Sequence, residues 1–258
     1  MRRESEDQFE GAAAGIGKWL RDLKISIGFL TLWRMTVSPP PDMVDVGRSS
    51  WAFPVVGAII GLTLSMFYGL CDVFFPQTVC ALLTVILWVA ITGGLHLDGW
   101  TDCWDALGAS VSIERRREIL KDSRLGAFGA IGLILLLLTK VVTLMVIKAP
   151  WSGMIIAAVT GRAMMALASQ GALTSGRGMA RDFLEGVQRE SCIFCWGFTI
   201  LVALLAGITG LLSIVAAYGA AFWFRRFAES RIGFINGDVL GSICELSEVT
   251  VLIISCSK

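Results

Sequence analysis

The stretch LGAFGAIGLILLLLTKVVTLMVI, residues 125–147, carries one charge, Lys140, in a run that is otherwise almost wholly apolar. A helix needs about 20 mainly apolar residues to cross a hydrocarbon core about 30 Å thick, so this run is long enough to span a membrane. Of the 258 residues, 55% are hydrophobic and 17% are charged, against about 45–50% and about 25% in a soluble domain. The composition predicts an all-α, polytopic helical membrane protein.

Several further apolar runs are similar in length, and together they predict about seven transmembrane helices. The expected spans are residues 51–70, 76–96, 125–147, 150–174, 192–208, 210–228 and 238–256. The fifth and sixth belong to one continuous apolar stretch, which we divide at Gly207–Gly210. The transmembrane bundle would then occupy residues 51–256 of a single membrane domain that covers residues 1–258.

The segment before the first span, residues 1–41, predicts a polar start followed by an amphipathic helix. Within residues 16–35, apolar residues recur at helical spacing with charged residues between them, which is typical of a helix at the membrane surface. Packing of the same stripe against the bundle is the alternative. Pro39, Pro40 and Pro41 should end the helix, because proline removes a backbone donor and blocks a helix interior.

Basic residues are unevenly divided between the two sides of this topology. With the N-terminus in the cytoplasm, nearly all Lys and Arg residues outside the spans are cytoplasmic, and only Lys148 and Lys258 lie on the opposite side. This is the positive-inside pattern. It favours seven spans over six, because six would place the last loops on the wrong side. We therefore expect a multi-pass protein of the cytoplasmic (inner) membrane.

GGLHLDGWTDCWDALG, residues 93–108, would lie at the cytoplasmic end of the second span. Asp98, Asp102 and Asp105 are spaced i, i+4 and i+7, so in a helix they would line one narrow face. Like charges at this spacing destabilise a helix, and a divalent cation would reverse that effect. Mg²⁺ prefers oxygen ligands, so the three aspartates are candidate ligands for it. A solvated acidic patch at the membrane interface is the alternative.

His96, the only histidine, precedes Asp98 by two residues. It is either a packed polar residue or a catalytic one, and Asp98 and Asp102 are the other candidates for proton transfer. The sequence does not choose the general base among them.

Downstream, Arg117, Lys121 and Arg124 repeat the spacing of the aspartates with positive charge. An acidic face and a basic face in one loop are what a metal-bound polyphosphate would need during phosphoryl transfer. The three are therefore candidate substrate-binding residues. The alternative is positive-inside anchoring, with salt bridges to Glu114, Glu118 and Asp122.

Ionisable residues within spans are costly, and they are usually functional or paired. Arg162 lies about 18 Å along its helix from the start of the fourth span, and Glu248 about 15 Å from the start of the last. Their similar depth predicts a structural pair, with Glu245 one turn nearer the cytoplasm.

Three charged residues in or beside the spans have two readings each. Lys140 either snorkels to the outer surface or binds substrate. Asp238 either caps the last helix, as aspartate often does, or binds substrate. Arg162 is a candidate for substrate binding as well as for pairing.

Taken together, these stretches resemble the cobalamin synthase family, the adenosylcobinamide-GDP ribazoletransferases. The matching stretches are FPVVGAIIG (53–61), the block 93–108, KDSRLGAFG (121–129), GRAMM (161–165), RGM (177–179), RIGFINGDVLG (231–241) and ELSE (245–248). They occur in the order of the family and cover most of the chain from Phe29 to Val249. Two features depart from its pattern: Ala106 follows Asp105 where glycine is common, and Trp100 and Trp104 stand where smaller residues are common.

The resemblance implies an enzyme of late cobalamin assembly at the cytoplasmic membrane face. Such an enzyme joins adenosylcobinamide-GDP to α-ribazole or its 5′-phosphate, forms adenosylcobalamin or its 5′-phosphate, and releases GMP with the help of Mg²⁺. The expected partners are these substrates and the lipid bilayer, with a homo-oligomer or other cobalamin-assembly enzymes as further candidates and no nucleic acid.

Two other functions are weighed against this one. A CDP-alcohol phosphotransferase also uses aspartates at a helix end, but its DG-x2-AR pattern is absent here, since Asp98–Gly99 is followed by Trp100, Thr101, Asp102 and Cys103. A transporter would line a pathway with Arg162 and Glu248, but it would not need a basic triplet beside an acidic one.

Overall fold

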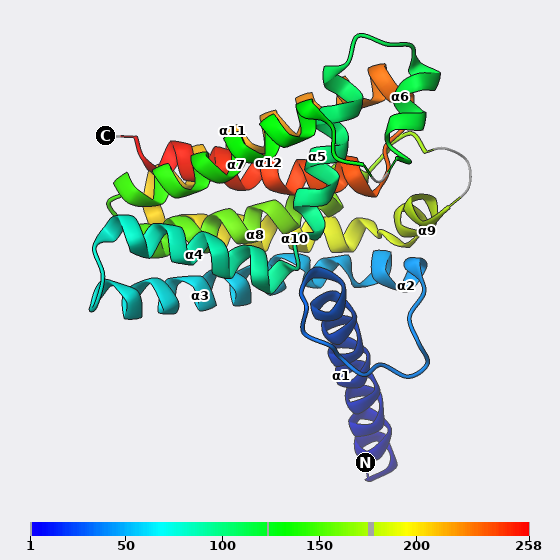
Figure 1. The fold of residues 1–258 in the computed structure, drawn as a ribbon. Coiled ribbons are helices and arrows are strands. Elements are labelled where there is room, and N and C mark those ends of the chain that lie inside the picture. The colour runs from blue at the N-terminus through cyan, green and yellow to red at the C-terminus, as the bar shows by residue number, and fades with distance from the viewer. Residues whose placement is uncertain (1, 123, 175–177, 258) are drawn as a thin grey trace.

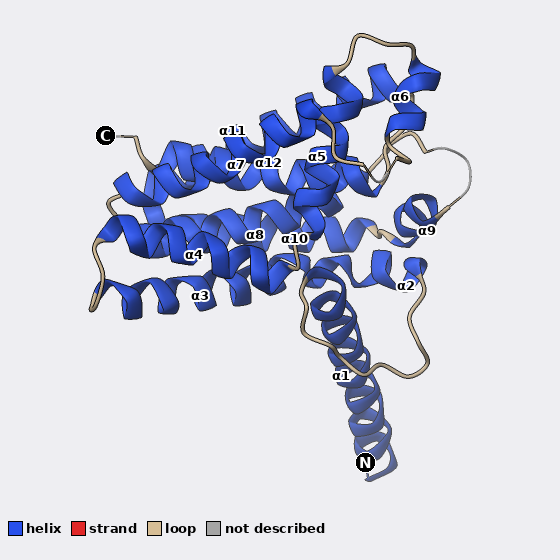
Figure 2. Cartoon of the chain, in the orientation of Figure 1, coloured by secondary structure: helices blue, strands red, loops and turns tan. Residues whose placement is uncertain are grey.

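The structure, a computed structural model, describes residues 2–122, 124–174 and 178–257. Within these ranges every regular element is a helix, as Figure 2 shows. The predicted all-α fold of a membrane protein is therefore confirmed. Ser123, Arg177 and Lys258, which belong to the sequence features above, lie outside the described residues.

The helices follow one another with short connections. Their bounds are α1 Arg2–Leu30, α2 Met43–Arg48, η1 Ser49–Ala52, α3 Phe53–Asp72, α4 Gln77–Thr92, α5 Leu95–Gly108, α6 Ile113–Ile119, α7 Ala127–Val146, α8 Pro150–Ser169, α9 Met179–Gly186, α10 Arg189–Ala203, η2 Leu204–Ala206, α11 Gly207–Ile232 and α12 Gly237–Ser255.

The central helix of the bundle is α8, in which every residue from Ser152 to Ser169 is buried. Helices α3, α10, α11 and α12 pack against it, and α7 packs against α4, α5 and α12 (Figure 1). Gly57 and Gly61 of α3 face the α8 backbone at points where any side chain would collide with it. Small residues of this kind let membrane helices approach closely, which explains how α8 becomes fully enclosed.

Fewer than the seven expected segments are long and apolar enough to cross a membrane. In the described part of the chain, four segments could each cross a membrane: Met43–Asp72, Ala127–Val146, Pro150–Ser169 and Arg189–Ile232. A fifth results if α4 and α5 count as one broken span. Part of the difference lies in α12, which is long enough but carries the three acidic residues Asp238, Glu245 and Glu248.

Another predicted span lies within Arg189–Ile232, which folds back on itself. The ring centroids of Trp196 and Tyr218 are 5.1 Å apart, whereas in one straight helix they would be separated by about 33 Å. The reversal occurs at Gly207, which has a positive φ of 58°. Helices α10 and α11 therefore form a hairpin, and its turn lies where the sequence predicted the division.

The predicted second span, residues 76–96, is too long. Helix α4 ends at Thr92, because Gly93 and Gly94 both adopt left-handed conformations with φ of 64° and 69°. The chain turns there, and α5 is bent by 94° from α4. We therefore count α5 as a separate helix outside the spanning segments. The fourth span is also shorter than predicted, since α8 ends at Ser169 rather than at residue 174.

Helix α1 covers more of the N-terminus than the predicted 16–35 and ends earlier, at Leu30. The prolines therefore do not end it; instead the chain leaves the helix and the Leu32 amide donates to the Ile91 carbonyl of α4 at 2.8 Å. Ile25 and Leu30 are buried against the bundle, whereas Ile16 and Trp19 are exposed. The alternative of packing against the bundle holds for the second half of the helix.

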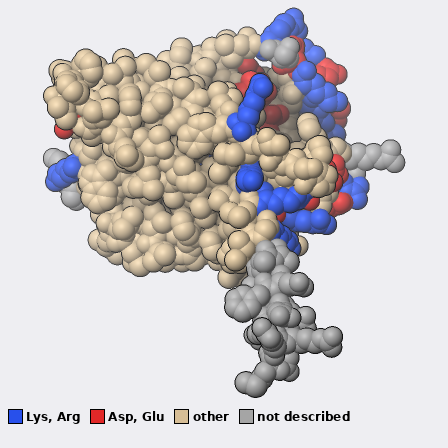
Figure 3. Space-filling model, turned by 90° about the horizontal axis from the view of Figure 1, so that it is seen from below, with Lys and Arg blue, Asp and Glu red and all other residues tan. Residues whose placement is uncertain are grey.

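Charged side chains gather at one end of the molecule. Figure 3 shows most Lys, Arg, Asp and Glu residues of the visible face at the end where α2, α6 and α9 lie in Figure 1, and a hollow there with acidic atoms inside and basic ones beside it. The remainder of that face carries few charged side chains, as expected for the side of a membrane bundle.

Candidate active site

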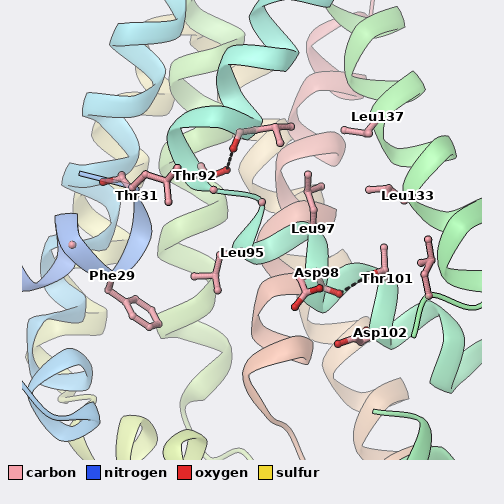
Figure 4. A pocket seen from close by; sticks show the side chains of 16 residues that line it. Phe29, Thr31, Thr92, Leu95, Leu97, Asp98, Thr101, Asp102, Leu133 and Leu137 are labelled. Carbon is pink, nitrogen blue, oxygen red and sulfur yellow. Dashed lines mark hydrogen bonds between the residues drawn. The ribbon is translucent and has the colours of Figure 1, made fainter. Parts of the chain in front are cut away.

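A cavity of about 800 Å³ opens beside α5 and is walled by segments far apart in the sequence. The end of α1 with the two residues Thr31 and Leu32 after it, the end of α4, α5, and α7 with Leu125 of the loop before it each contribute. The lining residues are Gly28, Phe29, Thr31, Leu32, Val89, Thr92, Gly93, Gly94, Leu95, Leu97, Asp98, Thr101, Asp102, Leu125, Leu133 and Leu137. Figure 4 shows Asp98 and Asp102 one turn apart on α5, with leucines of α5 and α7 above them.

Helix α5 is fixed in place by contacts with α7 and α12. The Trp100 indole N–H donates to the Gly132 carbonyl of α7 at 3.0 Å, and the Ser242 hydroxyl of α12 donates to the Gly99 carbonyl at 3.0 Å. Gly99 faces the backbone of Asp238 so closely that a Cβ atom would lie 2.7 Å from its Cα atom. The first turn of α12 therefore lies directly against the aspartate-bearing helix.

This contact brings a third acid to Asp98 and Asp102. Burial, and then the negative charges of Asp238, Asp98 and Asp105, together raise the pKa of Asp102 to about 6. We call Asp98, Asp102 and Asp238 the acidic cluster. A bound cation would relieve the repulsion between like charges held together in this way. The spacing of the aspartates predicted the same electrostatic effect.

Asp105 does not complete the predicted three-aspartate face, although α5 is a helix, as that face requires. Its Oδ2 atom accepts a hydrogen bond from the Gly126 amide and its Oδ1 atom one from the Gly129 amide, both at 2.8 Å. The carboxylate therefore holds the N-terminus of α7, where free amides and the helix dipole favour negative charge. Among the described residues, no group of three His, Cys, Asp or Glu side chains converges as a ready-made metal site.

Asp238 does not cap α12, so that alternative is wrong. The N-cap is Asn236, whose Oδ1 atom accepts from the Val239 amide at 3.1 Å. The Asn236 side-chain amide also donates to Asp238 Oδ2 at 2.6 Å. Asn236 thus fixes the Asp238 carboxylate, a role that the NGD triplet could have indicated, since asparagine caps helices as well as aspartate does.

His96 is buried away from the cavity. The residue is 2% exposed, its backbone lies beside Gly241 of α12, and it is absent from the described cavity lining. Within the described structure neither ring nitrogen has a hydrogen-bond partner. Burial, followed by the positive charges of Arg162 and Lys140, lowers the pKa of His96 well below its usual value. The structure favours the packed reading.

The predicted basic face is not formed, because α6 ends at Ile119 and Arg124 follows it in a loop. Arg117 Nε donates to the Ile232 carbonyl at 2.8 Å and its guanidinium lies 5.3 Å from the Phe234 ring. It thereby ties α6 to the connection between α11 and α12. Arg124 pairs with Asp122 at 2.6 Å, which agrees with the salt-bridge alternative.

Two of these cations nevertheless lie in the connection that leads to the cavity residue Leu125. Leu125 lines the cavity, and Arg124, the residue before it, has a side chain that is 86% exposed. Lys121 is exposed in the same connection. None of the three predicted cations belongs to the described lining itself.

Sequence reasoning missed Arg116, which stands between two other arginines and looks no different from them. Its side chain is buried and donates to the carbonyls of Ala106 at 2.5 Å and Leu107 at 3.0 Å. These carbonyls belong to the last turn of α5, where a cation also interacts favourably with the helix dipole. Arg116 therefore anchors the end of the helix that carries the acidic residues.

The four charged residues in the middle of the bundle form one buried network. The predicted pair of Arg162 and Glu248 is confirmed as an ion pair with both side chains fully buried. Lys140 does not snorkel: its Nζ atom lies 2.5 Å from Glu248 and 2.6 Å from Glu245, and it rests over the Trp88 ring. Two positive and two negative groups thus neutralise one another.

This network lies outside the described cavity lining. The structure therefore assigns the charges of Lys140 and Arg162 to pairing within the bundle, and it gives no support to their predicted role in substrate binding. Buried charges of this kind are tolerated only when they are paired and hydrogen-bonded.

Comparison with known proteins places these features in a family. The family model described as cobalamin-5-phosphate synthase matches residues 22–256. An adenosylcobinamide-GDP ribazoletransferase of Brevibacillus brevis is 34% identical over 207 residues, covering 78% of this chain and 84% of its own. The one from Syntrophobacter fumaroxidans is 32% identical over 234 residues, covering 88% and 94%, and the one from Pseudomonas putida is 33% identical over 234 residues, covering 89% and 96%. No solved structure matches.

Proposed function

We propose, from the premise that the chain belongs to the cobalamin-5-phosphate synthase family, that this transferase joins adenosylcobinamide-GDP to α-ribazole or α-ribazole 5′-phosphate. The names of its relatives supply the substrate class. The observation that carries the proposal is the cavity in which Asp98 and Asp102, both from the family block 93–108, lie together beside Asp238.

The proposed reaction is a single phosphoryl transfer. A ribose hydroxyl oxygen of the nucleoside attacks the phosphorus atom on the corrinoid side of the diphosphate. The new P–O bond forms as the bond to the bridging oxygen breaks, and GMP leaves with that oxygen. The hydroxyl proton passes to a cavity carboxylate, Asp98 or Asp102, since His96 is enclosed elsewhere. Loss of a general base commonly lowers a rate by about 10²–10⁴-fold.

We propose Mg²⁺ as the cofactor, held by Asp98 and Asp102. The donor set fits, because Mg²⁺ usually takes one or two protein carboxylates and fills its shell with water and substrate phosphates. The mutual repulsion in the acidic cluster, which adds to the effect of burial in raising the pKa of Asp102, would be relieved by a cation. When bound, the ion would neutralise charge on the diphosphate. Asp105, engaged with α7, is not needed for this.

Arg124 and Lys121 are the cations that we assign to the diphosphate. Arg124 precedes the cavity residue Leu125 and forms an exposed pair with Asp122, and exposed pairs of this kind contribute little to stability. The guanidinium can therefore exchange Asp122 for a phosphate at little cost. Arg117 is engaged with the α11–α12 connection and acts in positioning Asp238.

The charged end of the bundle, which carries the cavity, is the end that we assign to the cytoplasm. The motive is the strong bias of basic residues toward that end in the sequence. The two alternative functions are not favoured: the buried charges expected of a transporter pathway are paired with each other, and the chain matches a family other than the CDP-alcohol phosphotransferases.

A reconstituted assay tests the proposal. The purified protein is incubated with adenosylcobinamide-GDP, α-ribazole and Mg²⁺, and GMP and the corrinoid product are quantified together. We expect the two to appear in equal amounts and only when both substrates are present. Absence of GMP, in a preparation where the Pseudomonas putida relative is active under the same conditions, would contradict the proposed function.

A further inference from the structure

The cavity beside α5 has two chemically different ends. One end carries Asp98 and Asp102. The other, which we call the apolar end, consists of Val89 of α4, Leu97 of α5, and Leu133 and Leu137 of α7. In Figure 4, Leu133 and Leu137 point from α7 toward α5, above the two aspartates. A ligand that fills the cavity must therefore combine an apolar part with a phosphate-binding or reacting part.

The apolar end is a firm wall rather than a loose surface. Leu97 is buried, and behind it Trp100, Leu136 and Val249 form a small separate core on which Val89, Leu133 and Leu137 pack. The hydrogen bond from the Trp100 indole to the Gly132 carbonyl fixes this core between α5 and α7. A flat apolar group entering the cavity would meet surfaces already held in place, so little conformational entropy would be lost on binding.

The two proposed substrates differ in what they could place there. Guanine and the amide-rich corrin periphery carry many hydrogen-bonding groups, and burying such groups against leucine and valine without partners is costly. The nucleoside substrate instead carries an uncharged, methylated aromatic base on the same ribose whose hydroxyl must reach the phosphorus. Its base is the part that is both apolar and tied to the reacting end.

Resting on the proposed function, we propose that the apolar end binds the aromatic base of the nucleoside substrate and selects apolar bases over polar purines. The ribose then lies between the apolar end and the aspartates, which presents its hydroxyl to the diphosphate. An apolar wall of this kind discriminates chiefly by the cost of stripping water from a polar base and by the fit of its methyl groups.

Variants of α7 test the assignment, because Leu133 and Leu138 of this helix line different hollows. A second, wholly apolar groove of about 410 Å³ lies between α4 and α7 and is lined by Leu138, which is absent from the cavity lining in the described structure. Leu133 lines the cavity and not that groove. Leu133→Ala and Leu138→Ala therefore remove the same atoms from one helix, but only the first changes the apolar end.

We expect Leu133→Ala to raise the KM for α-ribazole by about tenfold, the low end of the about 10- to 200-fold that methylene-scale changes produce in apolar pockets. The preference for α-ribazole over an adenine α-riboside, measured as the ratio of kcat/KM values, should fall by a similar factor. The KM for adenosylcobinamide-GDP should stay within twofold. Leu133→Met should restore the preference, and Leu138→Ala should leave every constant unchanged.

Two results would overturn the assignment: an increase in the KM for adenosylcobinamide-GDP in place of that for α-ribazole, or an unchanged preference between the two ribosides. Thermal unfolding of each variant in detergent shows whether it is folded, and Leu133→Met supplies the same test if Leu133→Ala is not. If the wild-type protein releases no GMP, the proposed function fails by itself. Equilibrium binding of α-ribazole then tests the apolar end, and it is supported only if Leu133→Ala weakens binding and Leu138→Ala does not.

Discussion

Arg162 of α8 and Glu248 of α12 form an ion pair in the centre of the bundle, where both side chains are fully buried. Removal of one partner leaves an uncompensated buried charge, which typically costs about 3–5 kcal/mol. We expect Arg162→Met and Glu248→Gln each to lower the stability of the protein strongly. The double variant should recover part of the loss, because Lys140 remains paired with Glu245 at 2.6 Å.

Thermal unfolding of the three variants in one detergent measures this coupling. Contacting residues usually show interaction energies of about 0.5–3 kcal/mol, whereas independent sites are additive within about 0.5 kcal/mol. Additive losses would mean that the two residues do not depend on each other, and the network would then owe its stability to Lys140 and its two glutamates.

The aspartates of α5 should separate into two classes on substitution. Asp98→Asn and Asp102→Asn remove carboxylates that line the cavity, so GMP release should fall at least about 10²-fold. Stability should be unchanged or higher, because the acidic cluster loses a repulsive charge. Asp105→Asn weakens the cap on α7, and we expect a stability loss of about 1 kcal/mol, typical of a lost helix cap.

The dependence on Mg²⁺ distinguishes the classes further. Asp98→Asn and Asp102→Asn should raise the Mg²⁺ concentration needed for half-maximal activity, while Asp105→Asn should not. Near-normal activity in Asp98→Asn and Asp102→Asn would support the solvated acidic patch and remove the basis for the proposed metal site.

The spacing of the aspartates indicated that a helix would bring them to one face, but not how their charges are used. Spacing along one chain places Asp98, Asp102 and Asp105 on a helix, and it contains no information about the helix that packs against it. The Asp105 carboxylate accepts hydrogen bonds from the amides of Gly126 and Gly129. Asp238 lies close to α5 because Gly99 has no side chain to keep α12 away. Both outcomes depend on contacts between residues distant in sequence, which periodicity does not reveal.

The intramembrane charges were more predictable than the loop charges. Burial in a membrane allows few arrangements for Arg162 and Glu248, so similar depth was enough to pair them. The sequence allowed the Lys140 side chain to extend to the surface or into the bundle. In the structure it extends inward, because Glu245 and Glu248 pair with it there. In the solvated loop, Arg117, Lys121 and Arg124 had many partners available, and the early end of α6 separated them.

Gly99 offers a test of the contact between α5 and α12. In Gly99→Ala the added Cβ atom would lie 2.7 Å from the Asp238 Cα atom, so the two helices must move apart. Overpacking of this kind costs about 1–3 kcal/mol, and the acidic cluster would be displaced with it. We expect a large loss of GMP release together with a lower Tm.

Gly237→Ala is the matched control for this variant, because nothing lies within 4 Å of a Cβ atom built at that position and it is in the same turn as Asp238. Its activity and Tm should be those of the wild type. Full activity in Gly99→Ala would show that the approach of Asp238 to α5 does not matter for the reaction.

The orientation of the bundle can be tested at the two ends of α7. That helix is about 30 Å long, and exposed loop residues lie beyond each end: Ser110 on the side of the acidic cavity and Lys148 on the other. Because basic residues gather on the side of Ser110, we expect that side to be cytoplasmic.

Single-cysteine variants Ser110→Cys and Lys148→Cys are treated with a membrane-impermeant thiol reagent in intact cells and again after permeabilisation. Lys148→Cys should react in intact cells and Ser110→Cys only after permeabilisation. The unsubstituted protein should label weakly, because its native cysteines in the described structure are all buried except the half-buried Cys256. The reverse pattern would place the cavity on the outer side, where the GDP-bearing substrate of the proposed reaction would have to be supplied from outside the cell.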